Sequence, residues 1–227
     1  MRTENIMTKA EQILSKIKDG FRTLVQPIVD VIADVKPNPN ILTAFSLLLS
    51  VAAAVVFAVG RLQPAALLLL LAGFLDILDG GVARASNRTT RFGALLDSVL
   101  DRYSEFAVFA GLGYHFFNRE ISHAESGRIL LLLIAAAMGG SLIVSYVRAR
   151  AEGLGFDCRV GLFQRPERLV VLSLGALISE QLLIIAVGLI AVMANVSALQ
   201  RIYHVWKLER TDGYESVSRD VHRTHWS

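Results

Sequence analysis

The pattern of apolar positions along the chain predicts six membrane-spanning helices. A helix crosses the hydrocarbon core of a bilayer with about 20 mostly apolar residues, and runs of this order occur six times. They are Ile41–Val59, Ala65 to about Ala83, Gly93–Phe117, Ile129–Val147, Leu169–Ile178 and Leu182–Leu199. The fifth run is short and reaches span length only if it extends back to about Val160, through the charged sequence RPER. The expected fold class is therefore an all-α integral membrane protein with six transmembrane helices.

The segments on either side of these runs are polar. Residues 1–36 alternate Lys, Glu and Asp with apolar residues at spacings of three, four and seven, which predicts an amphipathic helical segment on the cytoplasmic side. Such a helix either lies in the membrane interface or packs on the protein as a soluble helix. Residues 209–227 are polar without periodicity and predict a disordered tail. The expected domain is the six-span unit at 37–208.

The basic residues are sorted between the two sides of the predicted spans. Of 23 Lys and Arg residues, 19 fall on the segments that share a side with the termini, and three fall on the alternate loops. Because Lys and Arg accumulate on cytoplasmic loops, both termini are expected in the cytoplasm of a multi-pass protein of the cell membrane. Topology thus accounts for the net charge of +3, and we expect no nucleic-acid partner. A hydrophobic content of 53% and a mean hydropathy of +0.49 agree with the membrane assignment.

Four carboxylates lie where the membrane should exclude them. Asp76 and Asp79 lie in the second span at i and i+3, and Asp97 and Asp101 lie in the third at i and i+4. Each pair therefore shares one helix face, so the two helices could present four carboxylates to one point. A charged group inside a span costs at least about 2.5 kcal/mol and is a functional candidate. With no His or Cys nearby, these oxygen ligands suit Mg²⁺ or Mn²⁺ better than zinc.

Small and basic residues accompany the carboxylates. Gly80, Gly81 and Gly93 would allow a close approach of backbones and ligand. The connection between the two spans also carries three arginines, at 84, 88 and 91, which could meet a phosphate at the cytoplasmic edge. The alternative is that these arginines only mark topology and that the aspartates form salt bridges with them.

This segment resembles the CDP-alcohol phosphotransferase family. The family signature D-x2-D-G-x2-A-R-x8-G-x3-D-x3-D is matched at every fixed position, by Asp76, Asp79, Gly80, Ala83, Arg84, Gly93, Asp97 and Asp101. The resemblance implies a homodimeric enzyme that transfers a phosphatidyl group from a CDP-linked lipid to an alcohol and releases CMP. It also implies two metal ions, Mg²⁺ or Mn²⁺.

The resemblance also implies roles for the residues of this sequence that match the family's functional positions. It places one ion on Asp76, Asp79 and Asp97, and the other among Asp76, Asp97 and Asp101, with Asp101 also the catalytic base. The positions that match family contacts to the CDP-lipid are Asn38, Pro39, Asn40, Ile41, Gly80, Arg84 and Thr90. Residues 38–41 also read as a turn that starts a helix, and both interpretations can hold.

A second basic set indicates a phosphorylated acceptor. Arg148, Arg165, Arg168 and Arg201 lie at the cytoplasmic ends of the last three spans, on the side of the aspartates, and arginine suits bidentate phosphate recognition. The strings SYVRARAEGLG, RPERLV and LQRIYHVW resemble bacterial phosphatidylinositol phosphate synthases, in which the matching residues hold myo-inositol 3-phosphate; Arg148 stands where Lys is expected.

Three alternatives stay open. Glycerol 3-phosphate would make the enzyme a phosphatidylglycerophosphate synthase, an ether-linked donor would make it an archaeal equivalent, and an ion-binding transporter could also use intramembrane carboxylates.

Overall fold

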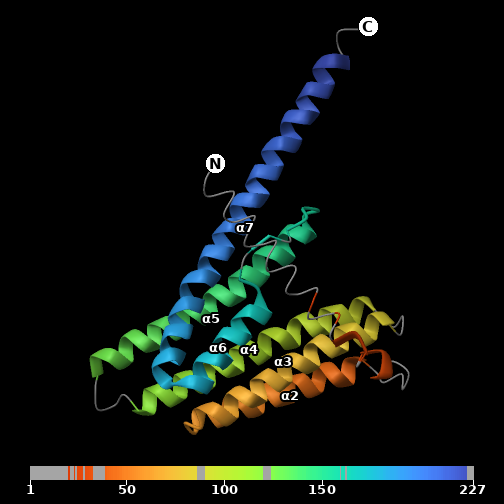
Figure 1. Ribbon diagram of the computed structural model, residues 1–227. Helices are drawn as coiled ribbons and strands as arrows, with labels where there is room; N and C mark the ends of the chain where they lie inside the picture. Colours follow the sequence, from red (N-terminus) through yellow and green to blue (C-terminus); the bar gives the residue numbers. More distant parts are fainter. Residues whose placement is uncertain are drawn as a thin grey trace.

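The described chain is helical and contains no strand. The computed structural model describes residues 20, 23, 25–27, 29–32, 39–85, 90–119, 124–158, 160–161 and 163–223. Its helices are α2 (Pro39–Ala58), α3 (Leu62–Ala85), α4 (Arg91–Arg119), α5 (Ala124–Gly153), α6 (Arg165–Ile178) and α7 (Glu180–Arg223), as seen in Figure 1. The all-α prediction is confirmed for these residues.

Four of the described helices are long and apolar enough to cross a membrane. They contain the stretches Asn40–Ala58, Leu62–Val82, Gly127–Gly153 and Glu180–Arg210, which correspond to the first, second, fourth and sixth predicted spans. α4 has 29 residues but carries Asp97, Asp101, Arg102 and Glu105 along one stretch. α6 has 14 residues, about 21 Å at 1.5 Å per residue, which is less than the hydrocarbon thickness of about 30 Å.

The predicted extension of the fifth span back to Val160 is wrong. α6 begins at Arg165, after Gln164 in an extended conformation with φ −83° and ψ 178°. Pro166 stands in the first turn, where its missing N–H is not needed. Residues 160, 161, 163 and 164 are not helical, and Gly161 has a φ of 126°, which favours glycine. The local chemistry of Gly161 and Pro166 therefore sets the start of this helix.

The C-terminal tail also differs from its prediction. The sequence predicts disorder over 209–227, whereas α7 continues as helix to Arg223 and projects past the other helices (Figure 1). This stretch contains no proline, and its Glu and Arg residues have favourable helix propensity. The lack of apolar periodicity indicates that this stretch does not pack on the protein. It does not exclude a helix, because the residues can continue α7 through their intrinsic helix propensity.

Part of the N-terminal segment packs on α3. Residues 25–27 and 29–32 are helical, and Val25 and Val29 are buried with Leu78 and Val82 of α3. Gly81 permits this contact, because a Cβ there would lie 2.9 Å from the Val29 side chain. Most of residues 1–36, and hence most of the predicted amphipathic helix, lies outside the described residues.

The bundle has an apolar interior and an apolar exterior. α2 packs against α3 and α4, α5 packs against α7, and α6 lies between α3 and α7. Phe57, Leu112 and Ile190 are fully buried in the core, while Leu67 and Ile185 are about 60% exposed, at 59% and 62%. Large apolar side chains on the outside of such long helices are what lipid contact requires.

Two tight turns fix how the helices follow one another. Gly60, with a φ of 81°, ends α2, and Arg61 donates its N–H to the Val56 carbonyl, a helix-terminating arrangement that favours glycine. α6 and α7 are joined through Ser179 alone, whose hydroxyl accepts the Leu182 N–H at 3.2 Å. Gly175 allows this hairpin, because a Cβ there would lie 2.9 Å from the Leu182 carbonyl oxygen.

The closest crossing of α2 and α4 is at Gly111, and it yields a test of the packing. A Cβ on Gly111 would overlap the carbonyl oxygen of Ala54, a backbone atom that cannot rotate away. We expect Gly111→Ala to lower the unfolding free energy by about 1–3 kcal/mol through overpacking, measured by thermal unfolding in detergent.

The matched control is Gly113→Ala on the same helix. A Cβ there would meet its nearest neighbour, Ile134, only at 4.0 Å, so the higher helix propensity of alanine should leave stability unchanged or raised. Equal melting temperatures for the two variants would contradict the proposed contact.

Candidate active site

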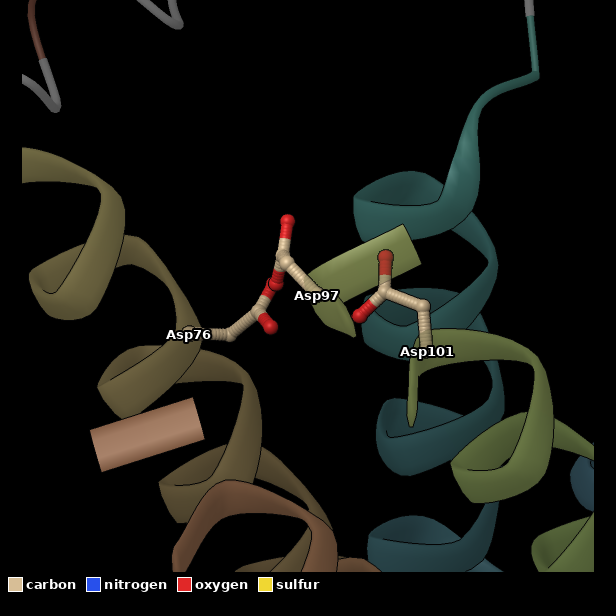
Figure 2. Close-up of side chains that lie close together, drawn as sticks. All are labelled: Asp76, Asp97 and Asp101. Atoms are coloured by element: carbon tan, nitrogen blue, oxygen red, sulfur yellow. The ribbon is translucent and has the colours of Figure 1, made fainter. Parts of the chain in front are cut away.

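Three of the four predicted carboxylates meet between α3 and α4. Asp76 projects from α3, and Asp97 and Asp101 project from successive turns of α4 (Figure 2). One oxygen from each carboxylate lies within 4.8 Å of the other two. α2 packs against both helices and so holds the two pairs at the same end of the bundle. The i,i+4 spacing read from the sequence therefore does place Asp97 and Asp101 on one face.

The Asp79 side chain is more buried than those of the other three aspartates and points toward Thr43 of α2. It is 5% exposed, and the Thr43 hydroxyl donates a hydrogen bond to its carboxylate. Its Oδ2 atom is buried and has no hydrogen-bond partner among the described residues. The fourth carboxylate thus lies beside the group of three, with one oxygen uncommitted.

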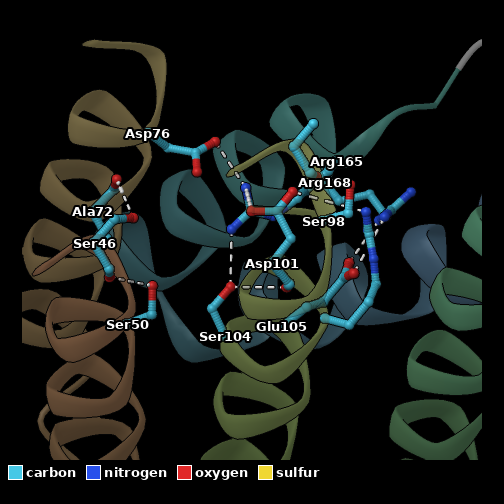
Figure 3. A network of polar contacts seen from close by, with 12 residues as sticks. Ser46, Ser50, Ala72, Asp76, Ser98, Asp101, Ser104, Glu105, Arg165 and Arg168 are labelled. Carbon is cyan, nitrogen blue, oxygen red and sulfur yellow. Dashed lines mark hydrogen bonds and ion pairs between the residues drawn. The ribbon is translucent and has the colours of Figure 1, made fainter. Parts of the chain in front are cut away.

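Arg165 reaches from α6 into the carboxylate group. Its Nη1 atom lies 2.8 Å from Asp76 Oδ2 and 2.5 Å from Asp101 Oδ1. Its Nη2 atom donates to the Ser104 hydroxyl at 2.9 Å, and Figure 3 shows this network. One guanidinium therefore neutralises carboxylates from two helices at once, which explains how α6, a late element in the chain, is positioned against α3 and α4.

Arg168 forms a second ion pair one turn further along α6. Its Nε and Nη2 atoms donate to the two oxygens of Glu105 at 2.8 and 3.3 Å (Figure 3). Its Nη1 atom donates to the Phe163 carbonyl. With an exposed fraction of 3%, this arginine is held on all sides by the protein. Glu105 is hence its structural partner.

Arg201 and Arg148 come from the two long neighbouring helices. Arg201 is 4% exposed and donates to the carbonyls of Val160, at 2.8 Å, and Val144, at 2.6 Å. It thereby fastens the segment before α6 to α5. Arg148 is exposed and pairs with Glu152 one turn along α5, at 2.8 Å.

These side chains surround one cavity. A cavity of about 950 Å³ is lined by residues of α4, α5, α6 and α7, among them all four arginines predicted for the acceptor. Asp97 and Asp101 also line it. The structure therefore brings the predicted acceptor residues next to two of the predicted metal ligands, although they come from distant parts of the sequence.

The residues predicted for the CDP-lipid lie at the start of α2, the end of α3 and the start of α4. Thr90 accepts the Gly93 N–H at 2.9 Å and so caps α4. A Cβ on Gly93 would lie 3.4 Å from Asn40 Oδ1, so Asn40 lies beside this turn. Ile41 is 65% exposed, and Gly80 lies one residue after Asp79 on α3.

The other three residues of this set are less completely described. Asn38 lies outside the described residues, and of Pro39 and Arg84 only the helical backbone is described.

Sequence reasoning assigned no role to Arg102 and Ser104 of α4. Arg102 lines the cavity, and its Nη2 atom lies 3.8 Å from Asp101 Oδ2. Arg102 was recognisable as the one basic residue inside a predicted span, which is a functional signal in itself. Ser104 carried no comparable signal, because a serine in an apolar helix is common.

The donor set fits a divalent cation. Asp76, Asp97 and Asp101 offer three oxygens in a small volume, and Asp79 adds a buried oxygen to which no described residue donates a hydrogen bond. Hard oxygen ligands of this kind are preferred by Mg²⁺ and Mn²⁺. The acidic cluster could therefore bind such an ion.

Comparison with known proteins places the chain in a family. The family described as CDP-alcohol phosphatidyltransferase matches residues 37–207. The archaetidylinositol phosphate synthase of Methanothermobacter thermautotrophicus is 36% identical over 87% of this chain and 96% of its own length. The phosphatidylinositol phosphate synthase of Mycobacterium marinum is 33% identical over 82% of this chain and 81% of its own length.

Solved structures agree with the sequence relatives. The phosphatidylinositol phosphate synthase of Mycobacterium tuberculosis with CDP-DAG bound has a TM-score of 0.70 and 32% identity, over 81% of this chain and 94% of that chain. The same enzyme in complex with manganese and citrate also has a TM-score of 0.70, with 33% identity over 80% and 88%. These matches decide against a transporter: the chain belongs to the CDP-alcohol phosphatidyltransferase family and is a membrane-associated transferase of phospholipid biosynthesis.

Proposed function

We propose that the protein transfers the phosphatidyl group of CDP-diacylglycerol to myo-inositol 3-phosphate, giving phosphatidylinositol phosphate and CMP. The observation that carries this proposal is the junction of a carboxylate cluster with an arginine-lined cavity of about 950 Å³. One part of the site suits a metal-bound diphosphate and the other an anionic acceptor. The relatives named above as synthases make products that contain inositol phosphate.

Two divalent ions, Mg²⁺ or Mn²⁺, are proposed as cofactors. Asp76, Asp79 and Asp97 would hold one, and Asp76, Asp97 and Asp101 would surround the other. When bound, such a pair neutralises the diphosphate and stabilises charge on the attacking and leaving oxygens. The manganese complex of the mycobacterial relative supports a metal of this class.

Asp101 is proposed as the general base. It lines the cavity into which the acceptor would enter, so its carboxylate can take the proton of the acceptor hydroxyl. The hydroxyl oxygen then forms a bond to the lipid-side phosphorus, and the bond from that phosphorus to the CMP oxygen breaks. Arg165 and Arg102, at 2.5 and 3.8 Å from the Asp101 carboxylate, place positive charge where the acceptor phosphate would lie.

The donor would bind at the cytoplasmic ends of α2, α3 and α4. The proposed contacts are Asn38, Pro39, Asn40, Ile41, Gly80, Arg84 and Thr90. The position of Asn40 beside Thr90 and Gly93 supports this grouping, because it joins the beginning of α2 to the beginning of α4.

The acceptor's phosphate would be held in the cavity formed by Arg148, Arg165, Arg168 and Arg201. All four line that cavity in the described structure. Their contacts divide them: Arg168 and Arg201 are buried and bonded to the protein, so they shape the pocket wall, whereas Arg148 is exposed at its rim.

The membrane arrangement is part of the proposal. We propose six spans, with α4 and α6 completing the bundle of four apolar helices, both termini in the cytoplasm and the protein in the cell membrane as a homodimer. Because α6 covers only about 21 Å of the hydrocarbon core, its charged start would lie within the site and not at the membrane surface. Ion pairing supports the inclusion of α6, because Arg165 and Arg168 are neutralised by Asp76, Asp101 and Glu105. The N-terminal segment would lie in the cytoplasmic interface, supported by the packing of Val25 and Val29 on α3.

Two other reactions of the same type are retained. An ether-linked CDP-lipid donor is supported by the 36% identity to an archaetidylinositol phosphate synthase. Glycerol 3-phosphate as acceptor would also require the arginine-lined cavity, because it too carries a phosphate.

Asp101→Asn tests the base. We expect turnover to fall by at least about 100-fold, the lower range for loss of a general base, measured as CMP release from CDP-diacylglycerol and inositol phosphate. The control is Asp30→Asn, an exposed carboxylate hydrogen-bonded to Gln26, which should keep full activity. Near-normal turnover by folded Asp101→Asn protein would remove Asp101 from this role.

Arg165→Gln tests the charge balance of the metal site. Arg165 competes with a metal ion for oxygens of Asp76 and Asp101, so its loss should tighten Mn²⁺ binding by about tenfold or more, given interactions of about 4 kcal/mol per unit-charge pair near 4 Å. Electron paramagnetic resonance of Mn²⁺ in the absence of substrates measures this. Arg61→Gln, an exposed arginine outside the site, should leave the affinity unchanged. Weaker Mn²⁺ binding by Arg165→Gln would show that the arginine supports the metal instead.

An acceptor panel tests the substrate. We expect myo-inositol 3-phosphate to be preferred at least about tenfold over inositol and serine, because a pocket built for a phosphate group loses its charge pairing with acceptors that lack one. We also expect it to be preferred over glycerol 3-phosphate, which keeps the phosphate but lacks the inositol ring. Release of CMP from CDP-diacylglycerol and from CDP-archaeol would be compared in parallel. A preference for glycerol 3-phosphate would overturn the proposed acceptor, and a preference for CDP-archaeol would overturn the proposed donor.

A further inference from the structure

The arginines of the cavity differ in how many hydrogen-bond donors they retain for a ligand. Of the described residues, five arginines line the cavity: Arg102, Arg148, Arg165, Arg168 and Arg201. A guanidinium carries five N–H donors in a fixed plane. Donors that already bond to the protein can meet a ligand only if those bonds break, so the partners of each arginine decide which of them can bind a phosphate.

The protein engages the donors of Arg168 and Arg201. Arg168 uses three nitrogen atoms on Glu105 and the Phe163 carbonyl. Arg201 uses Nε and Nη1 on the carbonyls of Val160 and Val144. Both side chains are almost fully buried, with exposed fractions of 3% and 4%. They hold α4, α5 and the segment before α6 together, and so they are positioning residues.

The other two previously assigned arginines are also paired. Arg165 bonds to Asp76 and Ser104 and forms an ion pair with Asp101. Arg148 donates from Nε to Glu152.

Arg102 differs from these four because two of its donor atoms are buried and unused. Its Nε and Nη1 atoms have no hydrogen-bond partner among the described residues, and its Nη2 atom lies 3.8 Å from Asp101 Oδ2, an ion-pair distance beyond direct hydrogen bonding. A charged group that is buried without hydrogen bonds is unfavourable, and an anion beside it would remove that penalty. The 29% exposed fraction of the side chain leaves it room to turn toward the cavity that it lines.

We propose that Arg102 donates hydrogen bonds to the phosphate of the acceptor alcohol, an inference that rests on the proposed function. Its planar fork matches two phosphate oxygens. Because the Arg102 guanidinium lies 3.8 Å from the carboxylate of the proposed base, a phosphate held there would anchor the acceptor within reach of Asp101. Arg102 is thus a substrate-binding residue that selects phosphorylated over neutral polyols, while Arg168 and Arg201 build the wall behind it.

Steady-state kinetics of Arg102→Gln and Arg102→Lys test this inference. For Arg102→Gln we expect the KM for myo-inositol 3-phosphate to rise at least about tenfold and the KM for CDP-diacylglycerol to change less than about twofold. Preference for inositol phosphate over inositol should fall by a similar factor. Arg102→Lys should recover part of the loss, because it keeps the charge but not the fork. Arg61→Gln is the matched control.

Direct binding separates a ligand role from a structural one. Thermal stabilisation by myo-inositol 3-phosphate should be lost in Arg102→Gln, while stabilisation by CDP-diacylglycerol is kept and the melting temperature without ligand does not fall. An unchanged acceptor KM, or an equal rise in both KM values, would overturn the inference. If Arg102→Gln does not fold, Arg102→Lys decides by the same measurements, and an unaltered acceptor KM there would overturn it.

Failure of the proposed function is distinguishable from failure of this inference. If the wild-type protein uses glycerol 3-phosphate instead, the acceptor assignment falls, and the same kinetics with glycerol 3-phosphate then test Arg102. If the wild-type protein prefers neutral acceptors, both proposals fall.

Discussion

A charged side chain inside a bundle of apolar helices needs a partner, since neither lipid nor a packed core can solvate it. Arg165 is the ion-pair partner of both Asp76 and Asp101, and it comes from a helix that lies far from both in sequence. Removing one partner of such a buried pair typically costs about 3–5 kcal/mol, because the remaining charge is left uncompensated. The placement of α6 between α3 and α7 therefore depends on this contact as well as on its apolar surface, which buries Leu172 and Ala176 in the core.

The same requirement shapes the start of α6. Arg165 and Arg168 must lie at the level of Asp101 and Glu105, so the helix begins with the charged RPER sequence and has only 14 residues. The preceding residues run as an irregular segment that Arg201 ties to α5 through the carbonyls of Val160 and Val144. An irregular backbone inside a helical bundle is tolerated where it lines a cavity and its polar groups are bonded.

The arginines of the site therefore serve more than one purpose. Their position on the predicted cytoplasmic side follows from the usual sorting of basic residues, which by itself would assign them no function. Their contacts separate them further: Arg168 and Arg201 build the wall of the cavity, Arg165 balances the carboxylates, and Arg102 has buried donors that bond to none of the described residues. A single cavity can then combine a negative metal-binding part with a positive part for an anionic acceptor.

Local spacing in the sequence determined the helices and the facing carboxylates. The length of the apolar runs sets four of the helices, and the i,i+4 spacing of Asp97 and Asp101 sets their common face, because helix geometry relates residues only a few positions apart. The family signature over residues 76–101 carried the enzyme class, since its fixed residues lie within two consecutive helices.

Only the tertiary structure decided how those residues are paired. The bond from Arg165 to Asp76 joins residues 89 positions apart, and no periodicity encodes such a distance. The orientation of Asp79 toward Thr43 and the absence of described hydrogen-bond partners for Nε and Nη1 of Arg102 likewise depend on which helices pack together. The hydrophobic pattern did not predict that α6 starts at Arg165. Its start is set by Pro166, by the positive φ of Gly161 and by the ion pairs of Arg165 and Arg168, and not by the length needed to cross a membrane. The sequence alone thus determined which residues could do chemistry, whereas long-range packing of charged groups decided what each one contacts.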